Sequence, residues 1–434
     1  MTVSGPPVVI PADDLPDPLR LTADWIYTGQ GEAQPGGTLV IEQGLISDLS
    51  THTDPRAIPV ASLSRTERAA GDLTSHASNR PYQTVLLPGL INCHTHLEFS
   101  DLAQPLEPSL PFTSWLRHLI QDRRSRGVDS RTAVHSGWRE ARATGTRLLA
   151  EISTSDEVGP WGETALRSPH DPVVLSFREI LGLRREARGP QLDVARRHLL
   201  QCQLKGVRGA ISPHAPYSVQ FDLFTDLVQL AVQEQVPVAM HLAETLAERE
   251  LLHAGTGEFV TFLTEMGVWQ PDLIPRGLRP FDYFQHLAEA RRALLVHANY
   301  LDHDEFAFLR DRPQMSVVYC PRTHAFFQHP PHPWQRLIAQ GTRVVLGTDG
   351  RGSNPDLSLW AELQFLHRMF PDIAPQQLLA LATTEAAEAL GLANEYGRLQ
   401  PGHCAAWTAI RIPPAKPSRF WSCLLDPAAQ PLDL

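Results

Sequence analysis

The chain has 434 residues, and its 38 Lys and Arg against 48 Asp and Glu give a formal net charge of −10. This length suits one large domain with a smaller one, and without a basic block neither nucleic acid nor an anionic membrane is an expected partner. Five scattered cysteines without a CxxC pair favour reduced thiols. With no signal-peptide pattern and no apolar run near about 18 residues, we expect a cytoplasmic protein without a membrane span.

The two ends of the chain are predicted to form a small β domain. Short strands punctuated by glycine are predicted at residues 21–27, 37–41 and 44–48, and another at 406–412 in the tail. Residues 51–80 are polar without periodicity and are predicted to form a surface loop. The expectation is one β-sandwich domain composed of residues 1–87 and 399–434.

Between about residues 85 and 390, short apolar runs alternate with amphipathic stretches such as 221–235 and 357–369. Eight runs have the length of strands, namely residues 85–92, 147–153, 173–179, 209–213, 236–241, 293–297, 316–319 and 343–347. Eight strands alternating with helices predict an α/β fold, a (β/α)8 TIM barrel at residues 88–398. In such barrels the active site lies at the C-terminal ends of the strands.

The ends of the predicted strands carry a set of candidate metal ligands. His94 and His96 are one residue apart, and on an extended strand such residues point the same way, toward one metal ion. Among 19 histidines, chance or a hydrogen-bonded core pair explains this spacing equally well. Later strand ends supply the further candidates His241, Glu244, His297 and Asp349.

Two of these candidates are carboxylates with different expected roles. Glu244 lies just beyond its strand, where it could move a proton between water and a leaving group, or simply favour the start of a helix. Asp349 follows an apolar run, where an unpaired buried carboxylate would be costly. Metal ligation, or a hydrogen bond to water on the metal, would remove that cost.

The set His94-Thr95-His96, His241-Leu242-Ala243-Glu244, His297 and Thr348-Asp349 resembles the amidohydrolase superfamily, in its mononuclear deaminase-like branch. The resemblance implies one divalent ion bound by His94, His96, His241 and Asp349. Zinc is the expected metal, and iron is the alternative. No lysine follows strand four to complete a two-metal site. The resemblance also implies that Glu244 shuttles protons, that His297 hydrogen-bonds the attacking water or the substrate, and that Asp349 accepts a proton from that water.

Three loops are similar to substrate-binding loops of this superfamily. The loop after the fourth predicted strand carries His214, and the loop after the seventh carries Arg322 and His324. The segment after the first predicted strand, with Glu98 and Trp115, resembles aminodeoxyfutalosine deaminases. Residues 347–357 resemble both these and the thioadenosine/adenosylhomocysteine deaminases. A hydrogen-bonded turn for His214, ion pairs for Glu98 and Arg322, and core packing for Trp115 are the alternatives.

The resemblance therefore implies a metal-dependent hydrolase that releases ammonia from an aminated heterocycle, with an adenine-containing nucleoside such as aminodeoxyfutalosine as the expected substrate. A triazine-type chlorohydrolase or an amide hydrolase is the alternative on the same scaffold. A non-catalytic scaffold protein is disfavoured because every ligand position is filled. The expected partner is a small molecule, and a homo-oligomer is an option left open.

Overall fold

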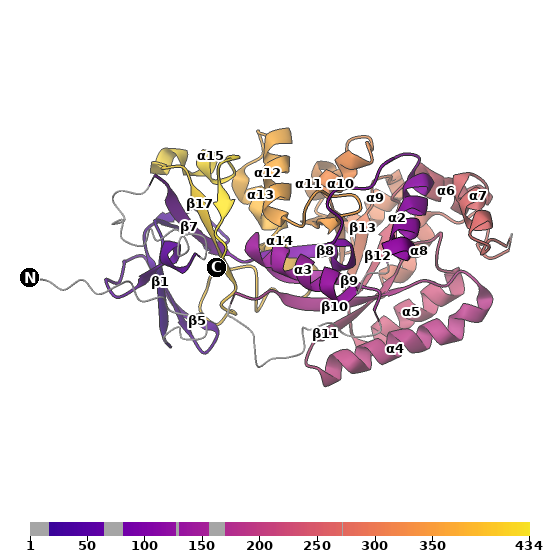
Figure 1. Ribbon diagram of the computed structural model, residues 1–434, viewed down its shortest axis with the longest axis horizontal. Coiled ribbons are helices and arrows are strands. Elements are labelled where there is room, and N and C mark those ends of the chain that lie inside the picture. Colours follow the sequence, from indigo (N-terminus) through magenta and orange to yellow (C-terminus); the bar gives the residue numbers. More distant parts are fainter. Residues whose placement is uncertain (1–16, 65–80, 127–129, 156–169, 271) are drawn as a thin grey trace, which may run out of the picture.

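The computed structural model describes residues 17–64, 81–126, 130–155, 170–270 and 272–434 of the chain. Figure 1 shows a large barrel at one end of the molecule and smaller sheets at the other. The indigo N-terminal strands and the yellow C-terminal strands lie side by side in these smaller sheets.

In the described part of the chain, eight parallel strands form the barrel, each hydrogen-bonded to the next in chain order. They are β8 (Leu90–His96), β9 (Thr146–Ser153), β10 (Val173–Ile180), β11 (Arg208–Pro213), β12 (Val238–Leu242), β13 (Ala293–His297), β14 (Met315–Tyr319) and β15 (Arg343–Leu346). The short β16 (Asp349–Gly350) follows β15 and pairs with β8, which closes the barrel. The predicted (β/α)8 barrel is confirmed.

Helices cover the outside of the barrel (Figure 1), and none of those described is long and apolar enough to cross a membrane. They are α2 (Phe112–Arg126), α3 (Ser130–Ala143), α4 (Arg188–Leu204), α5 (Phe221–Glu234), α6 (Leu246–Ala254), α7 (Glu258–Glu265), α8 (Pro280–Leu287), α9 (His303–Arg310), α10 (Pro321–Phe326), α11 (Trp334–Ala339), α12 (Leu359–Met369), α13 (Pro375–Leu381) and α14 (Thr384–Ala389), with α15 (Phe420–Leu424) near the C-terminus.

The terminal strands form two sheets with a shared apolar core. One sheet has the order β5-β4-β1-β6 and the other β18-β17-β7-β2-β3. Leu21, Leu39, Leu86 and Trp407 are buried in one cluster between them. The bounds are β1 (Leu19–Thr22), β2 (Trp25–Ile26), β3 (Gln34–Pro35), β4 (Thr38–Glu42), β5 (Leu45–Ser50), β6 (Ile58–Pro59), β7 (Gln83–Pro88), β17 (Trp407–Ile412) and β18 (Gln430–Pro431). The sandwich from both termini is confirmed, and its boundaries at 1–87 and 399–434 stay a prediction.

Three local predictions were wrong. The predicted strand 85–92 is two strands in different sheets, because the chain passes at Gly89 from the terminal sheet into the barrel. A Cβ at Gly89 would lie 2.6 Å from Cβ of Arg147, so only glycine fits this crossing. The predicted strand 21–27 likewise divides into β1 and β2. Residues 60–63 form a 3-10 helix that buries Val60 and Leu63, rather than a polar loop, and residues 65–80 lie outside the described part.

Arg147 connects the barrel to the terminal sheets. Its Nε donates to the carbonyl O of Trp407 (2.9 Å), and its Nη1 donates to the carbonyl O of Arg142 (3.0 Å). Burial lowers the pKa of this guanidinium to about 9.

Replacing Arg147 by Ala should leave these carbonyl groups unpaired in a buried place, which lowers the free energy of unfolding by about 2–4 kcal/mol. Urea unfolding measures this loss. The exposed Arg310, paired with Asp311, gives the matched control, and Arg310→Ala should change the free energy of unfolding by less than about 0.5 kcal/mol. Equal effects of the two substitutions would contradict the connecting role.

Candidate active site

Four polar atoms meet at one end of the barrel, where β8 and β12 end and β16 begins. His241 Nε2 lies 3.2 Å from Nε2 of His94 and 3.4 Å from Nε2 of His96. Asp349 Oδ1 lies 3.5 Å from His94 Nε2 and 3.6 Å from His96 Nε2. All four side chains are buried. The structure therefore brings together the four residues that the sequence suggested as metal ligands.

This donor set fits one divalent cation. Burial lowers the pKa of His94 and His96 well below the usual value, and that of His241 to about 4, so all three rings are neutral. His241 Nδ1 donates to the carbonyl O of His214 (3.0 Å), which leaves its Nε2 as a bare lone pair. Lone pairs at such separations repel unless a cation lies between them. Ligands placed tetrahedrally at about 2.0–2.2 Å from zinc are about 3.3–3.6 Å apart, close to the separations of His241 and Asp349 from His94 and His96.

Glu244 and His297 form a neutral pair beside these donors. Glu244 Oε1 lies 3.4 Å from His297 Nε2, and both side chains are buried. Burial raises the pKa of Glu244 well above its usual value, and the charge of Asp349 raises it further. Burial lowers the pKa of His297 well below its usual value. These shifts favour a carboxylic acid that can donate a proton and a neutral imidazole that can accept a hydrogen bond.

The backbone is strained where these side chains leave their strands. Ala243, His297, Ala298 and Asp349 have φ values of 54°, 71°, 48° and 58°, in the left-handed region that costs a residue other than glycine about 1–3 kcal/mol. One hydrogen bond that holds this backbone comes from His332, whose Nε2 donates to the carbonyl O of His297 (2.8 Å). Such strain is typical of active sites, because the surrounding structure must fix the geometry.

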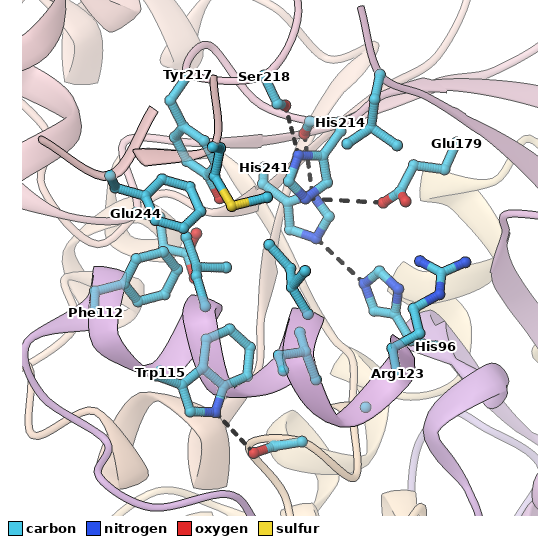
Figure 2. A pocket seen from close by; sticks show the side chains of 18 of the residues that line it. His96, Phe112, Trp115, Arg123, Glu179, His214, Tyr217, Ser218, His241 and Glu244 are labelled. Atoms are coloured by element: carbon cyan, nitrogen blue, oxygen red, sulfur yellow. Dashed lines mark hydrogen bonds and ion pairs between the residues drawn. The ribbon is translucent and has the colours of Figure 1, made fainter. Parts of the chain in front are cut away.

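A cavity of 480 Å³ includes His96, His241, Glu244, His297 and Asp349 in its wall. Figure 2 shows Phe112 and Trp115 of α2 on one side, with His214, His241 and Glu179 opposite. Trp115 Nε1 donates to the carbonyl O of Gly352 (2.9 Å), which fixes the indole. The remaining wall is mostly apolar and includes Leu119, Ile120, Leu183, Phe262, Leu263, Met266 and Val268.

Two carboxyl groups interrupt this apolar wall. Glu98 Oε2 accepts a hydrogen bond from Thr154 Oγ1 (2.9 Å) and pairs with Arg123 (3.0 Å), and burial raises the pKa of Glu98 to about 7. Glu179 Oε1 lies 3.8 Å from His214 Nε2, and burial raises the pKa of Glu179 (Figure 2). Both groups can hydrogen-bond hydroxyl groups of a bound molecule.

The five residues suggested for substrate binding do not all reach the cavity. Glu98, Trp115 and His214 line it, and His214 Nδ1 lies 2.6 Å from Ser218 Oγ. Arg322 and His324 are not part of the described cavity wall.

These two side chains bond within the protein because α10 begins directly after β14. Arg322 donates to Glu362 (2.7 Å) and to Asp356 (2.7 Å). His324 Nδ1 lies 3.1 Å from Asn299 Oδ1, and its Nε2 lies 2.9 Å from the carbonyl O of Pro330. Arg322 is thus an ion-pair residue, the alternative that its sequence context left open.

Two residues of the site, Glu179 and Ser353, were not predicted from the sequence. Glu179 lies near the end of β10, but Arg178 separates it from the preceding apolar residues, so its sequence signal is weaker than that of Asp349. Ser353 Oγ donates to Asp349 Oδ2 (2.6 Å) and so orients this carboxylate. Ser353 lies in the segment 347–357 that resembles the deaminases, but its contact with Asp349 depends on the turn after β16.

Comparisons with known proteins identify relatives of this chain. The model of the Amidohydrolase family matches residues 85–421. The aminodeoxyfutalosine deaminase of Deinococcus radiodurans is 28% identical over 387 residues, which cover 86% of this chain and 85% of the relative. The 5-methylthioadenosine/S-adenosylhomocysteine deaminase of Syntrophomonas wolfei is 28% identical over 337 residues, covering 74% of this chain and 72% of the relative.

A solved structure shows the same fold. Helicobacter pylori aminofutalosine deaminase in complex with methylthio-coformycin superposes with a TM-score of 0.76 at 20% identity, covering 95% of this chain and 97% of that one. The family match extends over the barrel and into the terminal strand β17. The chain therefore belongs to the amidohydrolase family.

Proposed function

We propose that this hydrolase deaminates an adenine nucleoside that carries a substituent at its 5′ position. The observation that carries the proposal is Glu244, a buried acid with a raised pKa, beside four converging donor atoms in the wall of a largely apolar cavity. Deamination of a purine ring needs a proton donor for the ring nitrogen next to the attacked carbon. The deaminase names of the relatives from Deinococcus radiodurans and Syntrophomonas wolfei support the same reaction.

In this proposal His94, His96, His241 and Asp349 hold one divalent ion. Three imidazoles and a carboxylate suit zinc best, and iron accepts the same donors. When bound, the ion supplies a Lewis acid that lowers the pKa of water toward 7.

The protein's own side chains then move the protons. Asp349, oriented by Ser353, accepts a proton from the water whose oxygen bonds to C6 of the purine. Glu244 gives its proton to the adjacent ring nitrogen, and His297 Nε2 lies 3.4 Å from Oε1 of the same acid. The C6–N bond then breaks, ammonia leaves with the proton from Asp349, and the proton on the new C6 hydroxyl returns to Glu244.

The cavity supports a nucleoside better than a free base. Its volume of 480 Å³ lies in the range of small-molecule sites, and its apolar wall can surround a purine and a large 5′ substituent. Glu98, Glu179 and His214 are the polar groups that could hydrogen-bond the ribose hydroxyls. A site that hydrogen-bonds a hydroxyl strongly rejects an analogue that lacks it.

The metal-loaded enzyme should convert 5′-substituted adenine nucleosides into their inosine counterparts, which a blue shift in purine absorbance and ammonia release measure together. Free adenine lacks the ribose hydroxyls and should show a kcat/KM at least about 100-fold lower. Preference for free bases, or activity only on amides or chlorinated triazines, would contradict the nucleoside proposal. It would not contradict the assignment as a metal-dependent hydrolase.

Metal content tests the ligand set. The wild-type protein should hold about one divalent ion per chain, measured by mass spectrometry of the metal, and the double substitution of His94 and His96 by Ala should lose both the ion and the activity. His198 is also buried but bonds to the carbonyl O of Ser176, so His198→Ala should keep the ion. Full metal content in the double variant would rule out this site.

Glu244→Gln should separate proton transfer from metal binding. The amide cannot donate an acidic proton, so kcat should fall by about 10²–10⁴ while the metal content stays unchanged. Glu250 lies exposed on α6, and Glu250→Gln should have wild-type turnover. Loss of the metal in Glu244→Gln would make Glu244 a ligand, and unchanged turnover would remove it from the mechanism.

A further inference from the structure

A second glutamate, Glu248 of α6, holds the backbone of Glu244 from outside the cavity. Its Oε1 accepts a hydrogen bond from the backbone N–H of Ala243 (2.8 Å), and its Oε2 accepts one from the backbone N–H of Glu244 (3.0 Å). Glu248 is fully buried and is not part of the described cavity wall. It therefore contacts the site only through the main chain.

This arrangement differs from an ordinary helix cap. Thr245 is the N-cap of α6, and its Oγ1 accepts from the backbone N–H of Glu248 (3.1 Å). A glutamate three residues after the N-cap usually accepts the N–H of the N-cap itself. Glu248 instead reaches past Thr245 to the two preceding N–H groups. With φ of 54° at Ala243, these successive N–H groups form the kind of concave site that binds anions.

The carbonyl side of Glu244 is held as well. Asn299 Nδ2 donates to the carbonyl O of Glu244 (3.0 Å), and Asn299 Oδ1 lies 3.1 Å from His324 Nδ1. Both backbone polar groups of Glu244 thus have side-chain partners outside the described cavity wall, on α6 and on the segment after β13.

We infer that Glu248 is a positioning residue for the proton donor, with Asn299 as its counterpart on the carbonyl side. By fixing the backbone of Ala243 and Glu244 in a strained conformation, the two side chains keep the carboxyl of Glu244 beside His297 and directed at the cavity. The inference rests on the proposed role of Glu244. A displacement of about 1 Å at such a group can lower the rate about 10²-fold, although no contact to the substrate is lost.

The rival explanation is that Glu248 only stabilises the start of α6. Glu305 provides the matched control, because it occupies the same position in α9 and is also fully buried. It accepts the N–H of the N-cap Asp302 (2.7 Å), and Arg249 pairs with it. Neither contact involves Glu244 or His297. If capping were the whole role, the two glutamates should respond alike to substitution.

The test compares Glu248→Gln with Glu305→Gln in the metal-loaded full-length enzyme. Glutamine keeps one accepting oxygen but places an NH2 group against the other backbone N–H, so one of the two bonds is lost. We expect kcat of Glu248→Gln to fall about 10–100-fold with KM within about threefold and metal content unchanged. The kcat of Glu248→Ala should fall further, and the kcat of Glu305→Gln should stay within about twofold of the wild-type value.

Wild-type kcat in Glu248→Gln, or an equal fall in both Gln variants, would overturn the inference. If Glu248→Gln does not fold, Asn299→Ala decides, because it removes the donor to the carbonyl of Glu244 while α6 keeps its cap. Wild-type kcat in Asn299→Ala would then overturn the inference. If the wild type releases no ammonia from nucleosides, the proposed function is wrong. The kcat values of the same variants are then compared on the substrate that the enzyme does hydrolyse.

Discussion

The site depends on the convergence of three imidazole nitrogens and one carboxylate oxygen, in which His241 and Asp349 each lie 3.2–3.6 Å from His94 and His96. Buried lone pairs and a buried carboxylate without a partner cost several kcal/mol, and one cation removes that cost for all four groups together. The barrel makes the convergence possible because its parallel strands end at the same rim. Closure of β16 onto β8 places Asp349 opposite the two histidines.

The apolar cavity and the proposed proton donor, Glu244, depend on the same burial. Burial holds Glu244 in its acid form and His297 in its neutral form, so a proton is available where charge develops. The strained backbone at Ala243 and His297 would relax if no other group held it. Glu248, Asn299 and His332 supply those contacts from outside the described cavity wall.

Much of this site was readable from the sequence because its signals are local. A histidine or carboxylate directly after an apolar run marks a strand end, and this pattern located His94, His241 and Asp349 together with the barrel itself. Glu179 lacks this clear signal, because Arg178 stands between it and the preceding apolar residues. The hydrogen bonds of Ser353 and Glu248 join residues only four or five positions apart, but they depend on the geometry of turns and are recognised only in the folded chain.

The errors have physical causes as well. An apolar run does not show which sheet it joins, so the passage at Gly89 from β7 to β8 was read as one strand. Arg322 follows a barrel strand as substrate-binding residues often do. Its guanidinium instead bonds Asp356 and Glu362, because the helix after β14 directs it away from the cavity. The position of a residue after a strand therefore predicts that the residue lies near the site. It does not predict the direction in which the side chain points.

The most direct test of the account is anomalous diffraction at the zinc absorption edge from crystals of the zinc-loaded protein. We expect one peak at about 2.0–2.2 Å from Nε2 of His94, His96 and His241 and from a carboxylate oxygen of Asp349. A second group of potential ligands, Glu179, His214 and His241, lies nearby and shares one histidine with the first. A peak in that second group, or no ordered peak at either, would contradict the account.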